Sequence, residues 1–204
     1  DKIALYGPIT ATCEASVREY VSPVLSLAAL IAGEIKMRAE QRISGLHGNG
    51  PLDCMFLYRK FPVTLTEVKE ENIQGGLAQN DAQLVASRQA YKYKLQTNLP
   101  EMVVESKKRK YLDIDISTIP SFGIVSTGRD WIFQKLEETG ETGATTTTIQ
   151  TSKLTSIDLI AGGEAVIRSQ MLTVVKKIVW MLKKQKEQVD SHQIAKKLKN
   201  EHQF

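Results

Sequence analysis

Two short runs with strand character, residues 53–58 and 63–69, are separated only by residues 60–62. A cluster rich in glycine and proline, residues 47–51, stands before the first run. Two runs of this kind joined by a short breaker predict a β-hairpin. Because helical patterns lie on both sides of the hairpin, we expect an α/β protein with a small mixed sheet flanked by helices.

Both helical patterns have recognisable start signals. Ser22-Pro23 offers an N-cap side chain followed by proline at the first helical position, which predicts a helix to about Ile43. Its buried face is expected to hold Val24, Ala28, Ile31 and Ile35. After two glycines, a second helix is predicted from about Leu77 to Leu95.

The C-terminal half is expected to extend this core. Residues 121–127 and 130–137 are typical of strands around a Thr-Gly turn. The threonine-rich segment 144–153 either pairs back as a hairpin or forms a mobile low-complexity loop. A long last helix is predicted over about residues 163–188.

The composition is that of an ordinary globular protein. Of 204 residues, 42% are hydrophobic and 25% are charged, which argues against disorder. We expect a single domain with its core over about residues 20–140, a C-terminal hairpin and helix over 141–190, and a basic tail over 191–204.

The chain also lacks the marks of a membrane or disulfide-rich protein. Its longest apolar run, residues 24–32, is shorter than the roughly 20 residues of a membrane span, so we expect no membrane association. The two cysteines, Cys13 and Cys54, do not have zinc-site spacing and are expected to be reduced thiols.

Three ionisable side chains are expected to converge at one end of the hairpin. Side chains alternate along a strand, so Glu67 and Lys69 share one face while Val68 points into the opposite layer. A turn centred on Phe61 would place Asp53 across from Lys69 on that same face. Two carboxylates and an ammonium group would then lie on one surface.

This arrangement predicts a metal site. Two carboxylates held close together repel each other unless a cation joins them, and oxygen ligands suit Mg²⁺ or Mn²⁺. Asp53 and Glu67 are the expected ligands. Such an ion would support phosphodiester hydrolysis, and Lys69 would either orient or deprotonate the attacking water or stabilise developing negative charge.

The segment Gly50-Pro51-Leu52-Asp53, followed after thirteen residues by Glu67-Val68-Lys69, resembles the PD-(D/E)xK nuclease superfamily. That superfamily includes restriction endonucleases, Holliday-junction resolvases and RecB-like exonucleases. The resemblance implies a restriction-endonuclease-like core of αβββαβ type, here with an extra β-hairpin and a long C-terminal helix. Leu52, between the proline and the aspartate, departs from the motif as usually written.

The resemblance also implies further site residues. It assigns the metal to Asp53, Glu67, Val68 and Glu34, the last as the glutamate of the first helix, with an ordinary boundary glutamate as the alternative. Gln79 and Gln83, four residues apart on the second helix, would position substrate or water. A solvated pair of glutamines is the other interpretation.

A longer string, from Gly50 through Thr66-Glu67-Val68-Lys69-Glu70-Glu71 to the segment 74–87, is similar to the nuclease-type domains of Crinkler effectors of oomycetes and fungi. This resemblance covers roughly residues 20–140. It implies an effector that acts in a nucleus, including that of a host cell after secretion. A cytoplasmic location is the alternative.

The charge distribution suits a nucleic-acid partner, with DNA expected ahead of RNA. The formal net charge is +4. The residues expected to contact phosphates are Arg88, Lys92, Lys107, Lys108, Arg109 and Lys110. The run 107–110 also has the density of a nuclear-import signal, and a solvated loop is the third interpretation. A homodimer is compatible with the sequence.

Other interpretations stay open at this point. His47 could ligate the metal or be a bystander in its loop, and the lysines of the last helix could face nucleic acid, a membrane surface, a partner helix or only solvent. The chain could also be a nucleic-acid-binding or effector module that has lost turnover. A scaffold that binds a partner through its last helix is a third hypothesis.

Overall fold

The computed structural model describes residues 13–45, 48–59, 61–97, 119–139, 146–159 and 163–201. The elements in chain order are α2 (Glu14–Ala32), β1 (Ile35–Gly45), β2 (Gly48–Tyr58), β3 (Phe61–Val68), α3 (Ile73–Thr97), β4 (Ser121–Ser126), β5 (Asp130–Thr139), β6 (Thr146–Thr151), β7 (Thr155–Ser156) and α4 (Gly163–Glu201).

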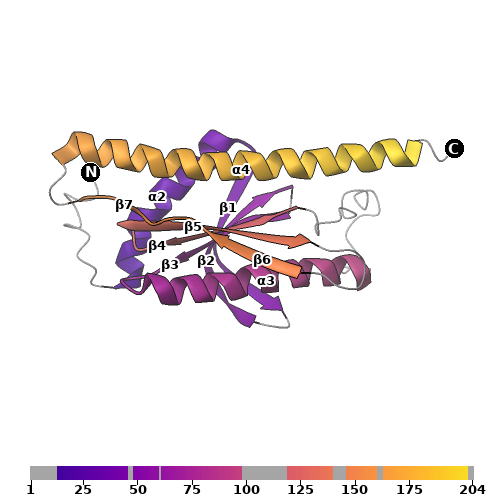
Figure 1. Ribbon diagram of the computed structural model, residues 1–204, viewed down its shortest axis with the longest axis horizontal. Helices are drawn as coiled ribbons and strands as arrows, with labels where there is room; N and C mark the ends of the chain where they lie inside the picture. Colours follow the sequence, from indigo (N-terminus) through magenta and orange to yellow (C-terminus); the bar gives the residue numbers. More distant parts are fainter. Residues whose placement is uncertain are drawn as a thin grey trace.

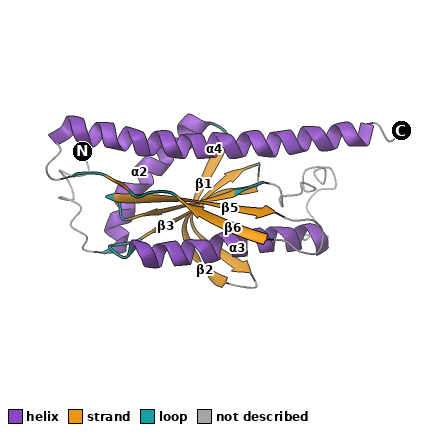
Figure 2. Cartoon of the chain, viewed as in Figure 1, coloured by secondary structure: helices purple, strands orange, loops and turns teal. Residues whose placement is uncertain are grey.

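These elements form a mixed sheet with helices on both faces, so the predicted α/β class is confirmed. The seven-stranded sheet has the order β1-β2-β3-β4-β5-β6, and β7 pairs with β5. Helices α2 and α4 cover one face and α3 covers the other (Figures 1 and 2). Strands β3 and β4 are parallel, and the remaining pairs are antiparallel. Because parallel neighbours need a long crossover, α3 joins β3 to β4.

The prediction for the first helix was wrong at both ends. Helix α2 begins at Glu14, contains Pro23 and ends before Gly33, whose φ of 71° is left-handed. A proline inside a helix costs a hydrogen bond, and the burial of a whole apolar face offsets that cost here. The buried residues of this face are Val17, Val21, Val24, Leu25, Ala28, Ala29 and Ala32.

The segment that was expected to complete this helix is strand β1. Ile35 and Met37 pack against the core, while Lys36 and Arg38, which alternate with them, are exposed. This alternation has the period of a strand, and it begins directly after the glycine that ends α2. β1 pairs antiparallel with β2 over nearly its full length.

The other predicted elements are present, with different ends. The hairpin of β2 and β3 forms, and so does the antiparallel pair of β4 and β5. The threonine-rich segment pairs with β5 as β6, which confirms the strand interpretation for residues 146–151. Helix α4 continues to Glu201, so most of the predicted basic tail is helical.

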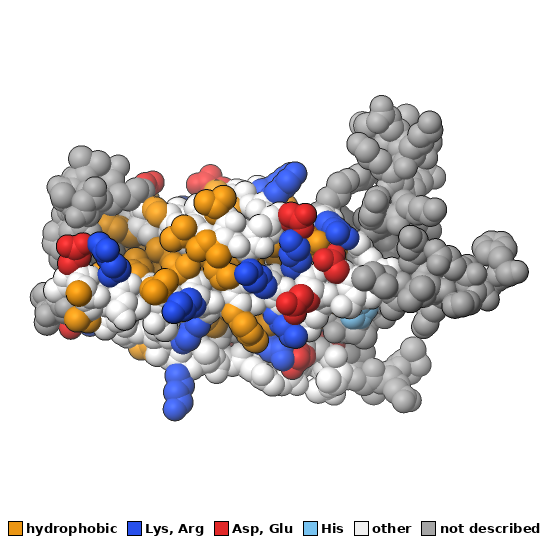
Figure 3. All heavy atoms as spheres, turned by 90° about the horizontal axis from the view of Figure 1, so that it is seen from above, with side chains coloured by type: hydrophobic (Ala, Val, Ile, Leu, Met, Phe, Trp, Pro, Cys, Tyr) orange, Lys and Arg blue, Asp and Glu red, His pale blue; other side chains and the backbone are white. Residues whose placement is uncertain are grey.

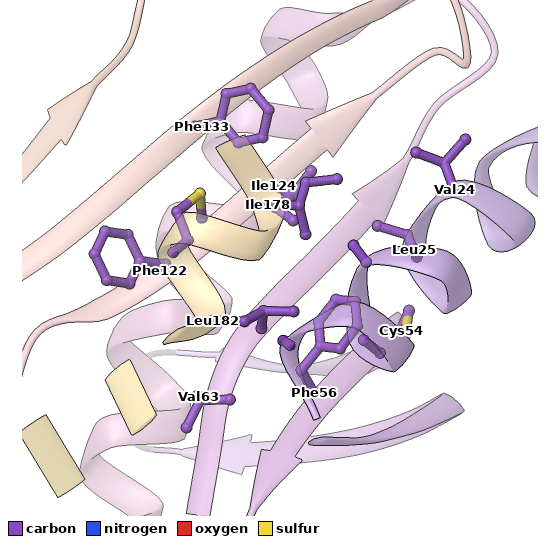
Figure 4. Packing of buried hydrophobic residues seen from close by; sticks show 14 of the residues in the cluster. Val24, Leu25, Cys54, Phe56, Val63, Phe122, Ile124, Phe133, Ile178 and Leu182 are labelled. Carbon is purple, nitrogen blue, oxygen red and sulfur yellow. The ribbon is translucent and has the colours of Figure 1, made fainter. Parts of the chain in front are cut away.

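The larger core lies between the sheet and the two helices α2 and α4. Figure 4 shows Val24 and Leu25 of α2, Phe56 and Ile124 of the sheet, and Leu182 of α4 in this layer. A smaller cluster lies under α3 and consists of Ile43, Leu52, Leu65, Leu84, Ala86 and Leu136. Helix α4 is therefore part of the main core and not an addition to it.

The outer face of α4 carries both apolar and charged side chains (Figure 3). Leu172 is 50% exposed and Trp180 is 61% exposed. Trp180 still makes an edge-on ring contact with Phe122, at 6.4 Å between ring centroids. Lys177 donates a hydrogen bond to Thr155, so part of the lysine-rich surface of α4 serves the fold.

Two features bear on the expectations for membrane and thiols. Among the described helices, α2 is the one whose length and hydropathy would suit a membrane span, although its inner face is buried in the core. Both cysteines are free, as predicted: Cys13 is exposed and Cys54 is buried. Burial raises the pKa of the Cys54 thiol to about 12.

Candidate functional site

The site lies where the β-hairpin ends against α2 and α3. The hairpin turns earlier than predicted, and Cys54 pairs with Thr66. This register brings Asp53 level with Glu67, so the expectation that Asp53 would lie opposite Lys69 was wrong by two residues. Since the side-chain period of a strand is two, a shift of two residues keeps the expected face.

Glu67 is the most enclosed acid of the site. Its side chain is 3% exposed, and its Oε1 atom lies 2.7 Å from the Nζ atom of Lys69. Gln83 of α3 donates from Nε2 to Oε2 at 2.9 Å. Burial raises the pKa of Glu67 despite these two contacts, and the nearby Asp53 adds to the rise. Burial therefore disfavours the ionised form of this carboxylate, whereas the Lys69 ammonium group and the Gln83 amide favour it.

Asp53 is bound on both of its oxygens. Its Oδ2 atom accepts a hydrogen bond from the backbone N–H of Val68 at 2.7 Å, and its Oδ1 atom forms an ion pair with Arg18. The side chain is 9% exposed. Burial raises the pKa of Asp53, although the Val68 hydrogen bond and the charge of Arg18 oppose this rise.

Lys69 stands between two acids. Its Nζ atom lies 2.7 Å from Glu67 and 3.5 Å from the Oε2 atom of Glu14. Burial opposes its charge, but the hydrogen bond and charge of Glu67, together with Glu14 and Asp53, raise the pKa of Lys69 above its ordinary value. Lys69 is thus an ammonium group at neutral pH.

The glutamate that α2 contributes to the site is Glu14, in the first turn of the helix. The predicted one, Glu34, follows the helix with a φ of 57°, and its side chain is 68% exposed beside Lys186 of α4. It lies next to Ile35, which pairs with Tyr58, five residues or about 17 Å along β2 from the site. The assignment of Glu34 to the site was therefore wrong.

Sequence reasoning missed Glu14 and Arg18 for one reason: both precede the helix start predicted at Ser22. Arg18 donates from Nη2 to the Oε1 atom of Glu14 at 2.7 Å. The signal that could have found them is this acid and base four residues apart, at the spacing of one helical face.

The two predicted glutamines share one face of α3, as expected. Together with Gly50 and Pro51 they line a pocket of about 220 Å³. Gln83 is buried, and besides its contact with Glu67 it donates to the backbone oxygen of Pro51 at 3.1 Å. The interpretation as a solvated pair is therefore wrong for Gln83, whereas Gln79 is half-buried at the pocket.

Arg88 does not lie on a surface that nucleic acid could reach. Its side chain is 2% exposed, and its Nε atom lies 3.1 Å from Glu138 of β5. It also donates to the backbone oxygen of Ile119 at 2.6 Å. These contacts tie α3 to β5 and to the segment directly before β4, so the predicted phosphate contact is corrected to a structural role.

Of the other residues predicted to contact phosphates, Lys92 lies on α3. The basic run Lys107, Lys108, Arg109 and Lys110 falls outside the described residues, and so does His47.

The donors at the site fit a hard divalent cation in kind. Within the described ranges, no group of three or more His, Cys, Asp or Glu side chains is already arranged around a common ion position. Asp53 and Glu67 nevertheless offer carboxylate oxygens, the ligands that Mg²⁺ and Mn²⁺ prefer. Val68 could contribute only its backbone carbonyl, which in a strand points to the same side as its N–H, here toward Asp53.

Gly123 of β4 lies where α3, which carries Gln83, packs against the sheet. A Cβ atom at this position would lie 2.0 Å from the Oδ1 atom of Asn80, whose amide lies 3.4 Å from Oε1 of Gln83. We expect Gly123→Ala to lower the free energy of unfolding by about 1–3 kcal/mol through overpacking. Urea unfolding measures the change.

A matched control is Gly50→Ala. No atom lies within 4 Å of the Cβ position there, so this variant should stay within about 0.5 kcal/mol of wild type. Equal midpoints for the two variants would contradict the close packing of α3 against β4.

Comparison with protein-family models, with curated proteins and with solved structures finds no match to this chain.

Proposed function

We propose that this chain is a Mg²⁺- or Mn²⁺-dependent nuclease of the PD-(D/E)xK type, with DNA as the expected substrate. The observation that supports it most is the grouping of Asp53, Glu67 and Lys69 at one end of the hairpin. Lys69 lies 2.7 Å from Glu67, and Asp53 is level with Glu67 across the strand pair. Two acids and an amine in this order are what the resemblance implies.

The order of elements gives further support. From α2 to β4 the chain runs helix, three strands, helix and strand, with the last two strands parallel. This order agrees with the αβββαβ core that the resemblance implies, which supports the proposal. Under this proposal Glu14 takes the part of the first-helix glutamate, because it contacts Lys69 whereas Glu34 pairs with α4.

The roles of the residues follow from their positions. Asp53, Glu67 and the Val68 carbonyl would hold the ion, which when bound polarises the phosphoryl group and lowers the pKa of a water molecule. Lys69, being protonated, stabilises negative charge on the phosphate and orients the water. Gln83 keeps the Glu67 carboxylate in place through its hydrogen bond.

The substrate class is supported by the surface beside the site. β1 is an outer strand of the sheet, and Lys36, Arg38 and Arg42 on it are exposed. Arg38 pairs with Met55, two residues along β2 from Asp53. A phosphate backbone that crosses the site could lie along these cations.

The test is cleavage of plasmid and of labelled single-stranded DNA by the purified chain in Mn²⁺. We expect Asp53→Asn to reduce the rate at least about 100-fold and Glu14→Gln to reduce it about tenfold. Glu34→Gln is the matched control and should retain the wild-type rate, because Glu34 lies near Tyr58, five residues along β2 from Asp53.

Two outcomes would overturn the proposal. Equal cleavage by wild type and Asp53→Asn would mean a contaminating nuclease or a different site. DNA binding without cleavage by wild type, across Mg²⁺ and Mn²⁺, would favour the alternative of a nucleic-acid-binding module that has lost turnover.

A further inference from the structure

Arg18 lies where it can neutralise Asp53, which the proposed ion would bind, and the neighbouring acid Glu14. Its Nη2 atom contacts Oδ1 of Asp53 and lies 2.7 Å from Oε1 of Glu14. Its Nη1 atom is 4.0 Å from Glu40, an exposed acid of β1. One guanidinium group thus joins two of the acids of the site.

The contacts of Arg18 are incomplete. Its Nε atom is buried and has no hydrogen-bond partner among the described residues. The side chain as a whole is 37% exposed, and it extends from the second turn of α2. A long side chain with an unpaired donor and more than a third of its surface exposed can leave its position without unfolding the helix.

The charges of the site favour such an exchange. Glu14, Asp53 and Glu67 carry three negative charges, and Arg18 and Lys69 carry two positive ones. A divalent ion added beside both cations would leave this half-buried site with one positive charge in excess. Release of Arg18 on metal binding restores neutrality, which a site with little solvent requires.

We propose that Arg18 is a built-in competitor of the metal: it holds Asp53 and Glu14 when no ion is bound, and it is displaced when Mg²⁺ or Mn²⁺ enters. This inference rests on the proposed function, because it concerns the same ion. As a consequence, the apparent affinity for the metal is lower than it would be without Arg18. Only the fraction of molecules in which Arg18 has left the acids can bind the ion.

The experiment is Mn²⁺ titration of the full chain by calorimetry, in the absence of nucleic acid. If Arg18 holds the acids about nine-tenths of the time, Arg18→Met should bind Mn²⁺ about tenfold more tightly than wild type. Arg18→Lys keeps a positive charge but has a single ammonium group in place of the two-pronged guanidinium. Its affinity for Mn²⁺ should therefore lie between those of wild type and Arg18→Met.

Arg168→Met is the matched control. Arg168 also donates to a glutamate four residues earlier, Glu164, at 2.7 Å near the start of a helix, but this pair is exposed on α4. The affinity of Arg168→Met for Mn²⁺ should equal that of wild type. Thermal melting gives a second readout: without metal, Arg18→Met should melt below wild type, and Mn²⁺ should raise its melting temperature by more.

The outcomes separate this inference from the function on which it rests. Equal Mn²⁺ affinity in wild type and both Arg18 variants, or weaker binding in Arg18→Met, would overturn the competition and leave the nuclease proposal standing. No Mn²⁺ binding in any variant, with circular dichroism of folded protein, would overturn the metal site and the inference with it.

Discussion

A Lys69→Met variant is expected to cleave DNA at least about 100-fold more slowly than wild type in Mn²⁺. Methionine nearly matches the length of lysine but carries no charge, so the substitution removes the ammonium group and leaves most of the packing. Because Glu67 and its neighbours raise the pKa of Lys69, the group is protonated at neutral pH. Its expected contribution is therefore charge stabilisation and orientation of water, and proton abstraction is not expected of it.

The control for this variant is Lys135→Met. Lys135 and Glu137 on β5 form a pair two residues apart, with 2.5 Å between Nζ and Oε1. Lys69, directly after β3, and Glu67 at its end form a similar pair. The pair on β5 is about one-third exposed and lies outside the proposed site. We expect an unchanged rate, measured under single-turnover conditions beside a melting curve for each variant. If folded Lys69→Met cleaved DNA at the wild-type rate, Lys69 would be only the ion-pair partner of Glu67 and would have no part in cleavage.

The largest expected effect on stability is that of Leu182→Ala. Leu182 of α4 is fully buried between the helix and the sheet, and its truncation should lower the free energy of unfolding by about 2–5 kcal/mol. Leu172→Ala on the same helix is the control. Its side chain is half exposed, so we expect a change within about 0.5 kcal/mol.

Urea unfolding followed by circular dichroism distinguishes the two variants. A shift of the midpoint at constant slope for Leu182→Ala would mean that α4 belongs to the cooperative core. A second, separate transition, or equal midpoints for both variants, would mean that the helix is an appendage that unfolds by itself.

Local signals in the sequence were sufficient for part of the fold. The hairpin, the second helix and the strands β4 and β5 were predicted because each has its own breaker and its own apolar period. Thr146–Thr151 formed the expected strand for the same reason, since branched side chains favour an extended backbone. The long C-terminal helix was predicted from its apolar spacing, although not its full length.

The first helix could not be placed from local signals. Ser22-Pro23 is a strong start signal, but the apolar face that α2 buries against α4 and the sheet continues through Pro23. The burial of that face depends on α4, which lies far along the chain. This one error led to the assignment of Glu34 to the site, and it also left Glu14 and Arg18 outside the predicted helix.

The burial of polar and charged side chains could not be predicted from the sequence either. Arg88 resembles any surface arginine in the sequence, and its enclosure depends on Glu138 of β5 and on the backbone at Ile119. Likewise, Gln83 is fixed by Glu67 and Pro51, which belong to the hairpin. The pattern of α3 alone contains no information about these partners.

The parallel pairing of β3 with β4 determines when, during synthesis, the candidate site can form. The backbone N–H of Lys69 donates to the carbonyl of Ser126 at 2.9 Å, so the end of the hairpin is anchored by a strand that the ribosome makes much later. Pairing between distant parallel segments is slow compared with hairpin closure. A nascent chain that ends before β4 therefore carries Asp53 and Glu67 without their mature geometry, and under the proposed function we expect it not to cleave nucleic acid.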